Sequence, residues 1–238
     1  TYALATYGRI IANKRGQGAM GVVGLSLEQT AEALKEYAGR VFCAIAHSVD
    51  STVVAGEPPA LDELFDRLSA QGVYCRKVDM DVAPHCPLAD ELRPELLAAL
   101  GGVSPRRGTI PIVSEVTGAV TPGESFDAAH WVRNFGDQAF FSTGIDCLIA
   151  QGFDTFLEVS PHPLVQHAVE ANLRHRRIAG SVLSAMRRHD ERGAMLDALA
   201  KGFLRFAHSC GRPVQVAYAV KACPAPDVLA LMRQHGLL

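Results

Sequence analysis

The order of apolar patterns between residues 19 and 80 constrains the fold of this chain more than any other feature of its sequence. Residues 19–25 form a short apolar run of strand length. Ser26 and Gln29 then give the Ser-x-x-Gln spacing of a capping box, which opens a helix through about Tyr37. The segment therefore begins with a strand followed by a helix.

The second half of this segment adds a hairpin, another helix and a last strand. Residues 41–46 and 51–55 are two runs rich in β-branched or apolar residues, separated by a turn-length connection. Apolar residues at helical spacing follow from Pro58 until Gly72, and residues 73–80 predict a final strand. The complete order is β-α-β-β-α-β, which is the order of a ferredoxin-like unit.

The flanking sequence predicts helices and strands in alternation, typical of an α/β layer with helices packed on a sheet. Residues 110–116 are expected to form a buried strand and residues 155–159 another. The expected helices are residues 1–16, 88–100, 127–135, 142–151, 164–173 and 194–207, the last followed by a proline-containing tail.

Composition excludes several classes of partner. The chain has 238 residues, 48% of them hydrophobic, with 23 Lys and Arg against 25 Asp and Glu. Such a balance predicts a folded protein that binds neither nucleic acid nor membrane surfaces. Its apolar runs are far shorter than the roughly 20 residues of a membrane span. The six cysteines are scattered singly, which favours free thiols in a reducing cytoplasm and no metal site.

Six short motifs in series are similar to those of acyltransferase domains of modular polyketide synthases and of bacterial malonyl-CoA:ACP transacylases. They span most of the chain, from about residue 16 to residue 190. The motifs are Gly16-Gln17-Gly18-Ala19-Met20, Ser51 to Glu57, Val78 to Pro87, Ile110 to Gly118, Trp131-Val132-Arg133-Asn134 and Leu157 to Pro163.

The resemblance implies an α/β fold with an α+β insert: a partial α/β-hydrolase-like large subdomain that carries a ferredoxin-like small subdomain. Residues 1–18 and 81–190 would belong to the large subdomain and residues 19–80 to the small one. Residues 191–238 would form a C-terminal helix and a linker that follows the acyltransferase.

The reaction implied by the resemblance is acyl transfer by alternating half-reactions. A serine takes an acyl group from coenzyme A, and the phosphopantetheine thiol of an acyl carrier protein removes it. No tightly bound cofactor is implied. The expected partners are the carrier protein, a neighbouring ketosynthase and other synthase domains.

His85 matches the family's general base, which takes the serine proton. Asn134 matches the position that accepts a hydrogen bond from that histidine and orients it. A pairing of Cys86 with His85 is not expected, since adjacent side chains of an extended segment point to opposite faces.

The nucleophile itself is missing from the sequence. No Gly-x-Ser-x-Gly elbow occurs in these 238 residues. The order of motifs in the family would place it upstream of residue 1, so the chain is expected to lack its N-terminal portion. A catalytically silent scaffold domain of a synthase is the alternative.

The acyl group remains open. Malonyl-type members hold the substrate carboxylate with an arginine, and the best register puts Tyr7 at that position. Either Tyr7 replaces the arginine, which favours a neutral acyl group or lost activity, or Tyr7 only packs and Arg9 or Arg15 binds the carboxylate.

Other residues are also candidates for substrate contact. Val82, Ala83 and Pro84 precede the histidine and would shape the pocket beside the acyl α-carbon. They depart from the aromatic patterns usual for malonyl and methylmalonyl selection. His47 stands where relatives often have asparagine, and either a buried polar role or a substrate contact is possible. His162 is expected to shape a turn.

Overall fold

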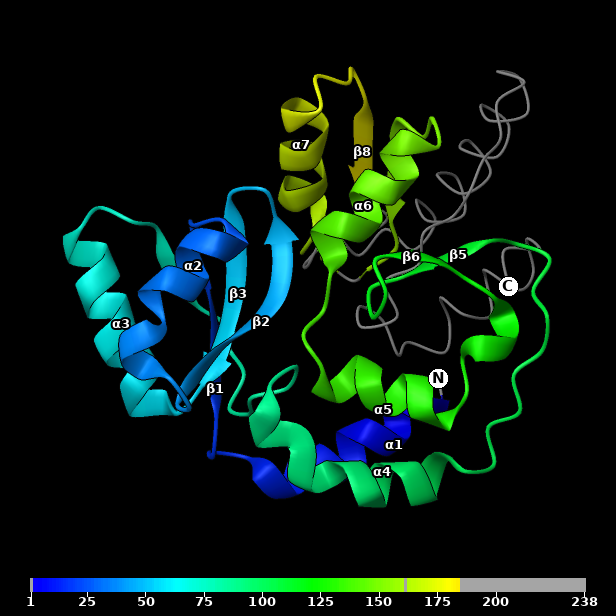
Figure 1. The fold of residues 1–238 in the computed structure, drawn as a ribbon, viewed down its shortest axis with the longest axis horizontal. Coiled ribbons are helices and arrows are strands. Elements are labelled where there is room, and N and C mark those ends of the chain that lie inside the picture. Colours follow the sequence, from blue (N-terminus) through cyan, green and yellow to red (C-terminus); the bar gives the residue numbers. More distant parts are fainter. Residues whose placement is uncertain (1, 161, 185–238) are drawn as a thin grey trace.

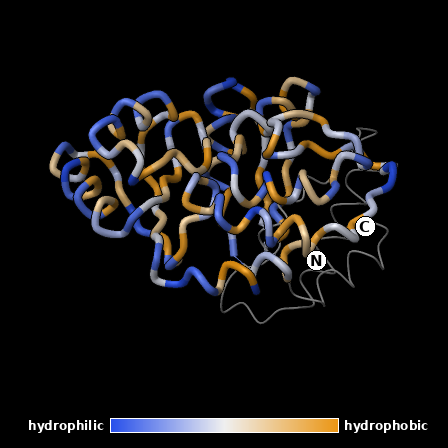
Figure 2. Tube along the Cα trace, turned by 60° about the horizontal axis from the view of Figure 1, so that its bottom comes forward, coloured by the Kyte–Doolittle hydropathy of each residue, from blue (hydrophilic) through white to orange (hydrophobic). Residues whose placement is uncertain are grey.

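The computed structural model describes residues 2–160 and 162–184, arranged as two units side by side (Figure 1). The helix expected at residues 194–207 and the tail after it lie outside these ranges. Figure 2 shows hydrophobic segments running through the interior of both units, with hydrophilic turns at the outside.

The smaller unit has the predicted order of six elements. They are β1 (Ala19–Val23), α2 (Leu27–Ala33), β2 (Val41–Ser48), β3 (Ser51–Gly56), α3 (Pro58–Ala70) and β4 (Cys75–Lys77). The strands form an antiparallel sheet in the order β2-β3-β1-β4. The last strand covers fewer residues than the predicted range 73–80.

Local sequence explains the start of α2. The Ser26 hydroxyl accepts a hydrogen bond from the Gln29 backbone N–H, and the Gln29 side chain accepts one from the Ser26 backbone N–H. This reciprocal capping box satisfies two backbone donors that a helix N-terminus otherwise leaves without partners.

Both faces of this sheet are covered. Alternate residues of each strand point to opposite sides. One side packs under α2 and α3, where Val23 and Val54 meet Leu61 and Leu64. The other side carries Met20, Ala44, Val53 and Ala55, which pack against Cys86 and its neighbours. The sheet therefore supports the loop that contains His85.

The larger unit contains two groups of elements. The first joins α1 (Tyr2–Ile11), α4 (Arg93–Leu100) and α5 (Ala128–Gly136) around a common apolar core. The second packs α6 (Phe141–Ala150) and α7 (Gln166–His175) on the parallel pair β7 (Thr155–Glu158) and β8 (Ser181–Ser184). A short 3-10 helix, Pro87–Leu92, leads into α4.

The prediction of a buried strand at residues 110–116 was wrong in length and burial. The strand β5 covers Ile112–Ser114 and pairs with β6 (Ala119–Thr121) in an antiparallel hairpin. Ile110 and Ile112 are each 42% exposed. An apolar run alone cannot distinguish a core strand from an exposed one, and the turn at Gly118, with a φ of 65°, closes the hairpin.

Close backbone contacts join the two units. The Gly16 N–H donates to the Asp81 carbonyl at 2.8 Å, so the entry and exit of the smaller unit lie side by side. A Cβ at Gly18 would lie 2.5 Å from the Ala83 nitrogen, and only glycine fits there. On the far edge, Ala139 exchanges hydrogen bonds with Ala44 and Ala46 of β2.

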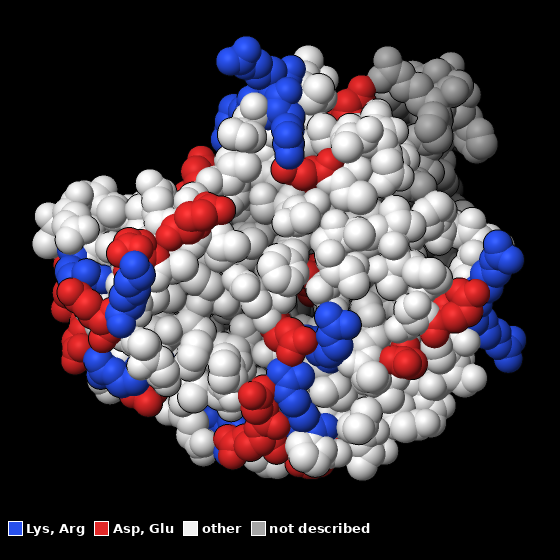
Figure 3. All heavy atoms as spheres, viewed as in Figure 1, with Lys and Arg blue, Asp and Glu red and all other residues white. Residues whose placement is uncertain are grey.

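The surface is electrostatically mixed. On the face shown in Figure 3, acidic and basic side chains stand mostly in neighbouring groups of opposite sign. Ion pairs between described residues include Arg67–Glu36 and Arg93–Asp137. Among the described residues, no helix has the length and apolar character that a bilayer crossing requires.

Shortening Leu61 tests the core of the smaller unit. Leu61 is fully buried, so Leu61→Ala should lower the free energy of unfolding by about 2–5 kcal/mol through lost burial and a residual cavity. Urea denaturation and hydrogen exchange of the β1 and β3 amides measure this loss. Asp66→Ala, on the exposed face of the same helix, should change stability by at most about 0.5 kcal/mol. Equal effects of the two variants would contradict this core.

Candidate active site

His85 occupies a strained position in the interior. It is 2% exposed and has a φ of 59°, in the left-handed region that residues other than glycine rarely adopt. Such strain persists where the surroundings over-determine the conformation, which is common at functional sites.

Two backbone carbonyls hold this residue in place. The His85 N–H donates to the Phe135 carbonyl at 3.0 Å, and the ring Nδ1 lies 3.2 Å from the Asp137 carbonyl oxygen. Because a carbonyl can only accept, Nδ1 must carry the ring proton. The other ring nitrogen, Nε2, is then the basic one, and it has no hydrogen-bond partner among the described residues. A neutral imidazole in this tautomer can accept a proton from a hydroxyl.

Asn134 does not make the contact expected of it. Its side-chain amide donates to Glu115 Oε1 at 3.0 Å, and the His85 ring bonds instead to the backbone three residues further along. The reason is geometric: Asn134 lies within α5, whereas Asp137 follows the end of that helix, where its carbonyl is free to turn toward the loop.

Two arginines hold the carboxylate of Asp137. Arg93 Nη2 donates to Asp137 Oδ1 at 2.6 Å, and Arg133 Nε donates to Oδ2 at 3.3 Å. Arg93 Nε also donates to Asp90 at 2.7 Å. Arg93 and Asp137 were not predicted from the sequence, since neither a backbone acceptor nor an ion pair across 44 residues leaves a local motif.

Cys86 is not equipped to act as a nucleophile. It is 2% exposed, its thiol donates to the Ala83 carbonyl at 3.2 Å, and burial raises its pKa to about 11. The thiolate, which is the reactive form, is therefore scarce near neutral pH.

Tyr7 and Arg9 lie in different environments. The Tyr7 ring stacks on Phe135 with 4.1 Å between ring centroids. Its hydroxyl is buried and has no hydrogen-bond partner among the described residues. Burial, with a smaller contribution from the nearby Cys86, raises the pKa of the phenol. Arg9 is exposed, and Arg15 pairs at the surface with Asp81.

The three residues before His85 belong to the same interior. Val82 and Pro84 are buried and Ala83 is half-buried. Ala83 packs against the sheet face that carries Met20 and Ala55. These residues offer small apolar surface and no charge beside the histidine.

His47 lies at the end of β2, where the two units meet. Its Nδ1 is 3.1 Å from the Ser51 hydroxyl, and its ring faces Phe141 at 6.0 Å between centroids. Burial lowers the pKa of His47, and the charges of Glu158 and Asp50 partly oppose this. The structure thus places the His47 ring, partly buried, at the junction of the units.

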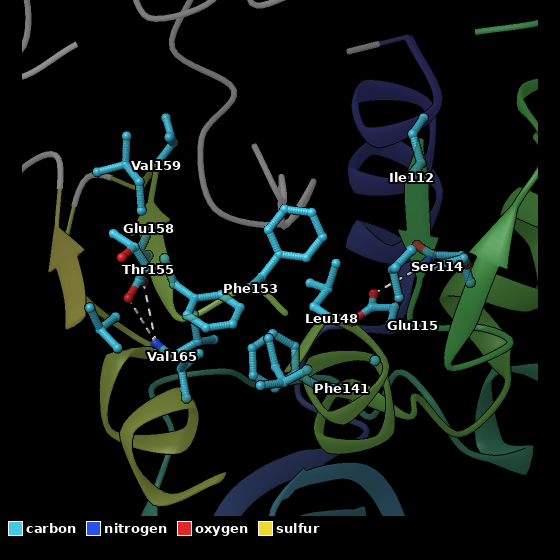
Figure 4. Close-up of a pocket in the computed structure, with 18 of the residues that line it drawn as sticks. Ile112, Ser114, Glu115, Phe141, Leu148, Phe153, Thr155, Glu158, Val159 and Val165 are labelled. Carbon is cyan, nitrogen blue, oxygen red and sulfur yellow. Dashed lines mark hydrogen bonds between the residues drawn. The ribbon is translucent and has the colours of Figure 1, made fainter. Parts of the chain in front are cut away.

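A cavity of about 130 Å³ opens in the larger unit, between α5, α6, β5 and β7 (Figure 4). Most of its described lining is apolar, with Phe141 and Phe153 on its walls. Glu158 is turned into the backbone, where it accepts hydrogen bonds from the N–H groups of Leu164 and Val165 before α7. Burial raises the pKa of Glu115, and the Asn134 amide partly opposes this. His85 is not part of this cavity wall.

Comparison with protein families gives a match over most of the chain. The family described as "Acyl transferase domain" matches residues 1–209. Among curated proteins, the erythronolide synthase EryA3 of Saccharopolyspora erythraea is 37% identical over 171 residues, which is 71% of this chain. The polyketide synthase GfsE of Streptomyces halstedii is 33% identical over 189 residues, or 79% of this chain. The chain spans 5% of the length of each of these synthases.

Solved structures show the same likeness in three dimensions. The acyltransferase domain from module 8 of the salinomycin polyketide synthase superposes with a TM-score of 0.81 at 29% identity, covering 90% of this chain and 49% of that one. A loading acyltransferase from the avermectin synthase gives a TM-score of 0.78 at 25% identity, covering 86% of this chain and 64% of that one.

The buried state of His47 makes stability depend on pH. An unfolded histidine titrates near pH 6.5, and His47 titrates lower in the folded chain, so stability falls as the pH drops below about 6.5. His47→Gln should flatten this fall between about pH 6.5 and 5, measured by urea denaturation across the range. His175→Gln, at an exposed helix end, should keep the wild-type slope. A His47→Gln slope equal to the wild-type slope would refute this assignment.

Proposed function

The chain belongs to the acyl transferase domain family, and from that premise we propose that it supplies the general base of an acyltransferase in a polyketide synthase. The observation that carries the proposal is the His85 ring, which is held by the Asp137 carbonyl with Nε2 left as proton acceptor. A silent scaffold has no need to hold a strained histidine in this way.

In the proposed first step, a serine from polypeptide outside this chain attacks the thioester carbonyl of an acyl-coenzyme A. His85 Nε2 takes the serine proton as the Oγ–C bond forms. The C–S bond then breaks, and the coenzyme A sulfur leaves with the proton that the imidazolium returns. The ring ends the step neutral, as it began.

In the second step the same cycle runs with a different thiol. The phosphopantetheine thiol of an acyl carrier protein gives its proton to His85 and attacks the serine ester. The serine oxygen takes the proton back as it leaves. The carrier protein and neighbouring synthase domains such as a ketosynthase are the partners that this role requires.

Asn134 takes an indirect part in this proposal. Its bond to Glu115 fixes the last turn of α5, so that Phe135 in this turn and Asp137 just after it present their carbonyls to His85. We therefore assign Asn134 to positioning rather than to direct contact with the histidine.

We further propose that the transferred acyl group is neutral. The best register of the resemblance puts Tyr7 at the position of the arginine that holds a carboxylate in malonyl-type members, and the phenol of Tyr7 offers one hydroxyl and no positive charge. Arg9 is exposed on another part of α1. A carboxylate placed beside this phenol would lose part of its hydration without gaining an ion pair.

Replacing the histidine tests the proposed base. In the complete protein that contains this chain, His85→Asn keeps a residue that tolerates the left-handed backbone and removes the base. Transfer from acyl-coenzyme A to the carrier protein should slow by about two to four orders of magnitude. Intact-mass measurement of the acylated serine and of the carrier protein follows both steps.

The matched control for this experiment is His167→Asn, whose side chain is 96% exposed and which should transfer at the wild-type rate. Equal thermal transitions of the variants show that folding is retained. Wild-type turnover by His85→Asn would remove this residue from the mechanism.

Changing Tyr7 tests the acyl group. The wild-type protein should load acetyl or propionyl groups in preference to malonyl groups. Tyr7→Arg should shift the ratio of kcat/KM values toward malonyl-coenzyme A by about tenfold or more, because a guanidinium can pair with the substrate carboxylate. Arg9→Met should leave the ratio unchanged. A wild-type preference for malonyl that Arg9→Met abolishes would show that Arg9 binds the carboxylate instead.

A further inference from the structure

We propose that Arg93 is a positioning residue for His85, acting through the ion pair that it forms with Asp137. This inference rests on the proposed role of His85 as base and adds to it the device that fixes the ring. The carbonyl of Asp137 binds the His85 ring and the carboxylate of the same residue binds Arg93. Because both groups belong to one residue, an ion pair that holds the carboxylate also limits rotation about the backbone bonds of Asp137, and so limits the movement of its carbonyl.

The contacts form a closed ring. From His85 the chain passes through Cys86 and the 3-10 helix Pro87–Leu92 to Arg93, at the start of α4. Arg93 reaches back to Asp137 at 2.6 Å, and the Asp137 carbonyl returns to His85 at 3.2 Å. Each member of the ring is tied to the next by a covalent bond or a hydrogen bond.

A second carboxylate also holds the Arg93 side chain. Its Nε donates to Asp90 Oδ1 at 2.7 Å, three residues earlier in the 3-10 helix. The guanidinium thus bridges two carboxylates with different nitrogens, a geometry that its planar fork allows and that an ammonium group cannot reproduce.

Gly136 supplies the space that this contact needs. A Cβ at Gly136 would lie 2.9 Å from Arg93 Nη2 and 3.0 Å from its Cζ. The guanidinium therefore lies directly over the backbone of the last residue of α5, next to Asp137. Among the described residues, no other arginine contacts this position of α5 so closely.

Arg133 is a second cation that binds the Asp137 carboxylate, so the orientation of this carboxylate depends on Arg93. Arg133, one helical turn earlier on α5, donates to Asp137 Oδ2 at the longer distance of 3.3 Å. Without Arg93 the carboxylate would be drawn toward Arg133 alone, and residue 137 would turn about its backbone. The carbonyl would then move away from Nδ1, and the preference of the His85 ring for the Nδ1–H tautomer would weaken.

Arg93→Met tests this inference because methionine keeps an unbranched side chain and removes the ion pair. The first readout is the tautomer of His85 by ¹⁵N NMR of the histidine side chains, assigned with His85→Asn. The wild-type protein should show the Nδ1–H form, and Arg93→Met should show a mixture of both tautomers. The second readout is acyl transfer, for which kcat should fall by about tenfold with KM little changed.

Two further variants sharpen the comparison. Gly136→Ala should displace the guanidinium while favouring the helix, and so should reproduce a smaller form of the same effect. Arg93→Lys should restore part of the Nδ1–H signal, since an ammonium can reach one carboxylate. Arg176→Met is the matched control: Arg176 directly follows α7 and contacts Asp146 of α6 at 2.5 Å, and breaking this contact should alter neither readout.

The NMR readout separates this inference from the proposed function. A wild-type tautomer that persists in Arg93→Met overturns the positioning role, whether or not the protein transfers acyl groups. A tautomer change with unaltered transfer overturns the role in catalysis. If the wild-type protein shows the Nδ1–H form but transfers no acyl group, the proposed function fails while the structural part of the inference stands.

Discussion

The structure depends on the backbone of residues 135–140, a segment in which successive peptide groups bind different parts of the molecule. The carbonyls of Phe135 and Asp137 hold His85, Ala139 joins the edge of β2, and the Phe140 N–H donates to the Glu115 carbonyl at 2.7 Å. These groups are available because α5 ends at Gly136 and the chain runs extended from Asp137. The C-terminal end of α5 and the residues after it thus link the smaller unit, the larger unit and the candidate base. Backbone N–H and C=O groups that have no partner within the helix bond to all three.

The sheet of the smaller unit gives this arrangement its rigidity. Because both of its faces are covered, one by α2 and α3 and the other by the loop around Cys86, the loop packs on a fixed surface. The close approach of Gly18 to Ala83 fixes the start of the same loop. His85 can therefore keep an unfavourable backbone conformation, since leaving it would disturb packing on one side and two hydrogen bonds on the other. The smaller unit packs against the loop that carries His85, and none of its described side chains forms a hydrogen bond with His85.

Local signals in the sequence were sufficient for much of the fold. The capping box at Ser26 and the apolar spacing of α3 depend on neighbours within one or two turns, and the structure has both elements where they were expected. The parts that sequence reasoning missed depend on distant contacts. Residues 110–116 are apolar enough for a core strand, yet Ile110 and Ile112 are exposed. Their burial depends on tertiary packing, which the local sequence does not reveal. The partner of His85 is a backbone carbonyl, which every residue has, so no side-chain pattern could distinguish Asp137 from Asn134.

A neutral group orients the candidate base, and this has a chemical consequence. A carboxylate bonded to Nδ1 would fix the tautomer and also place a full negative charge beside the ring. The Asp137 carbonyl fixes the tautomer with a dipole alone, while the carboxylate of the same residue pairs with Arg93 and Arg133. Within Asp137, the carbonyl orients the His85 ring and the carboxylate carries the negative charge. A dipole is weaker than a full charge, so the carbonyl can orient the ring without also stabilising its protonated form as strongly as a carboxylate would.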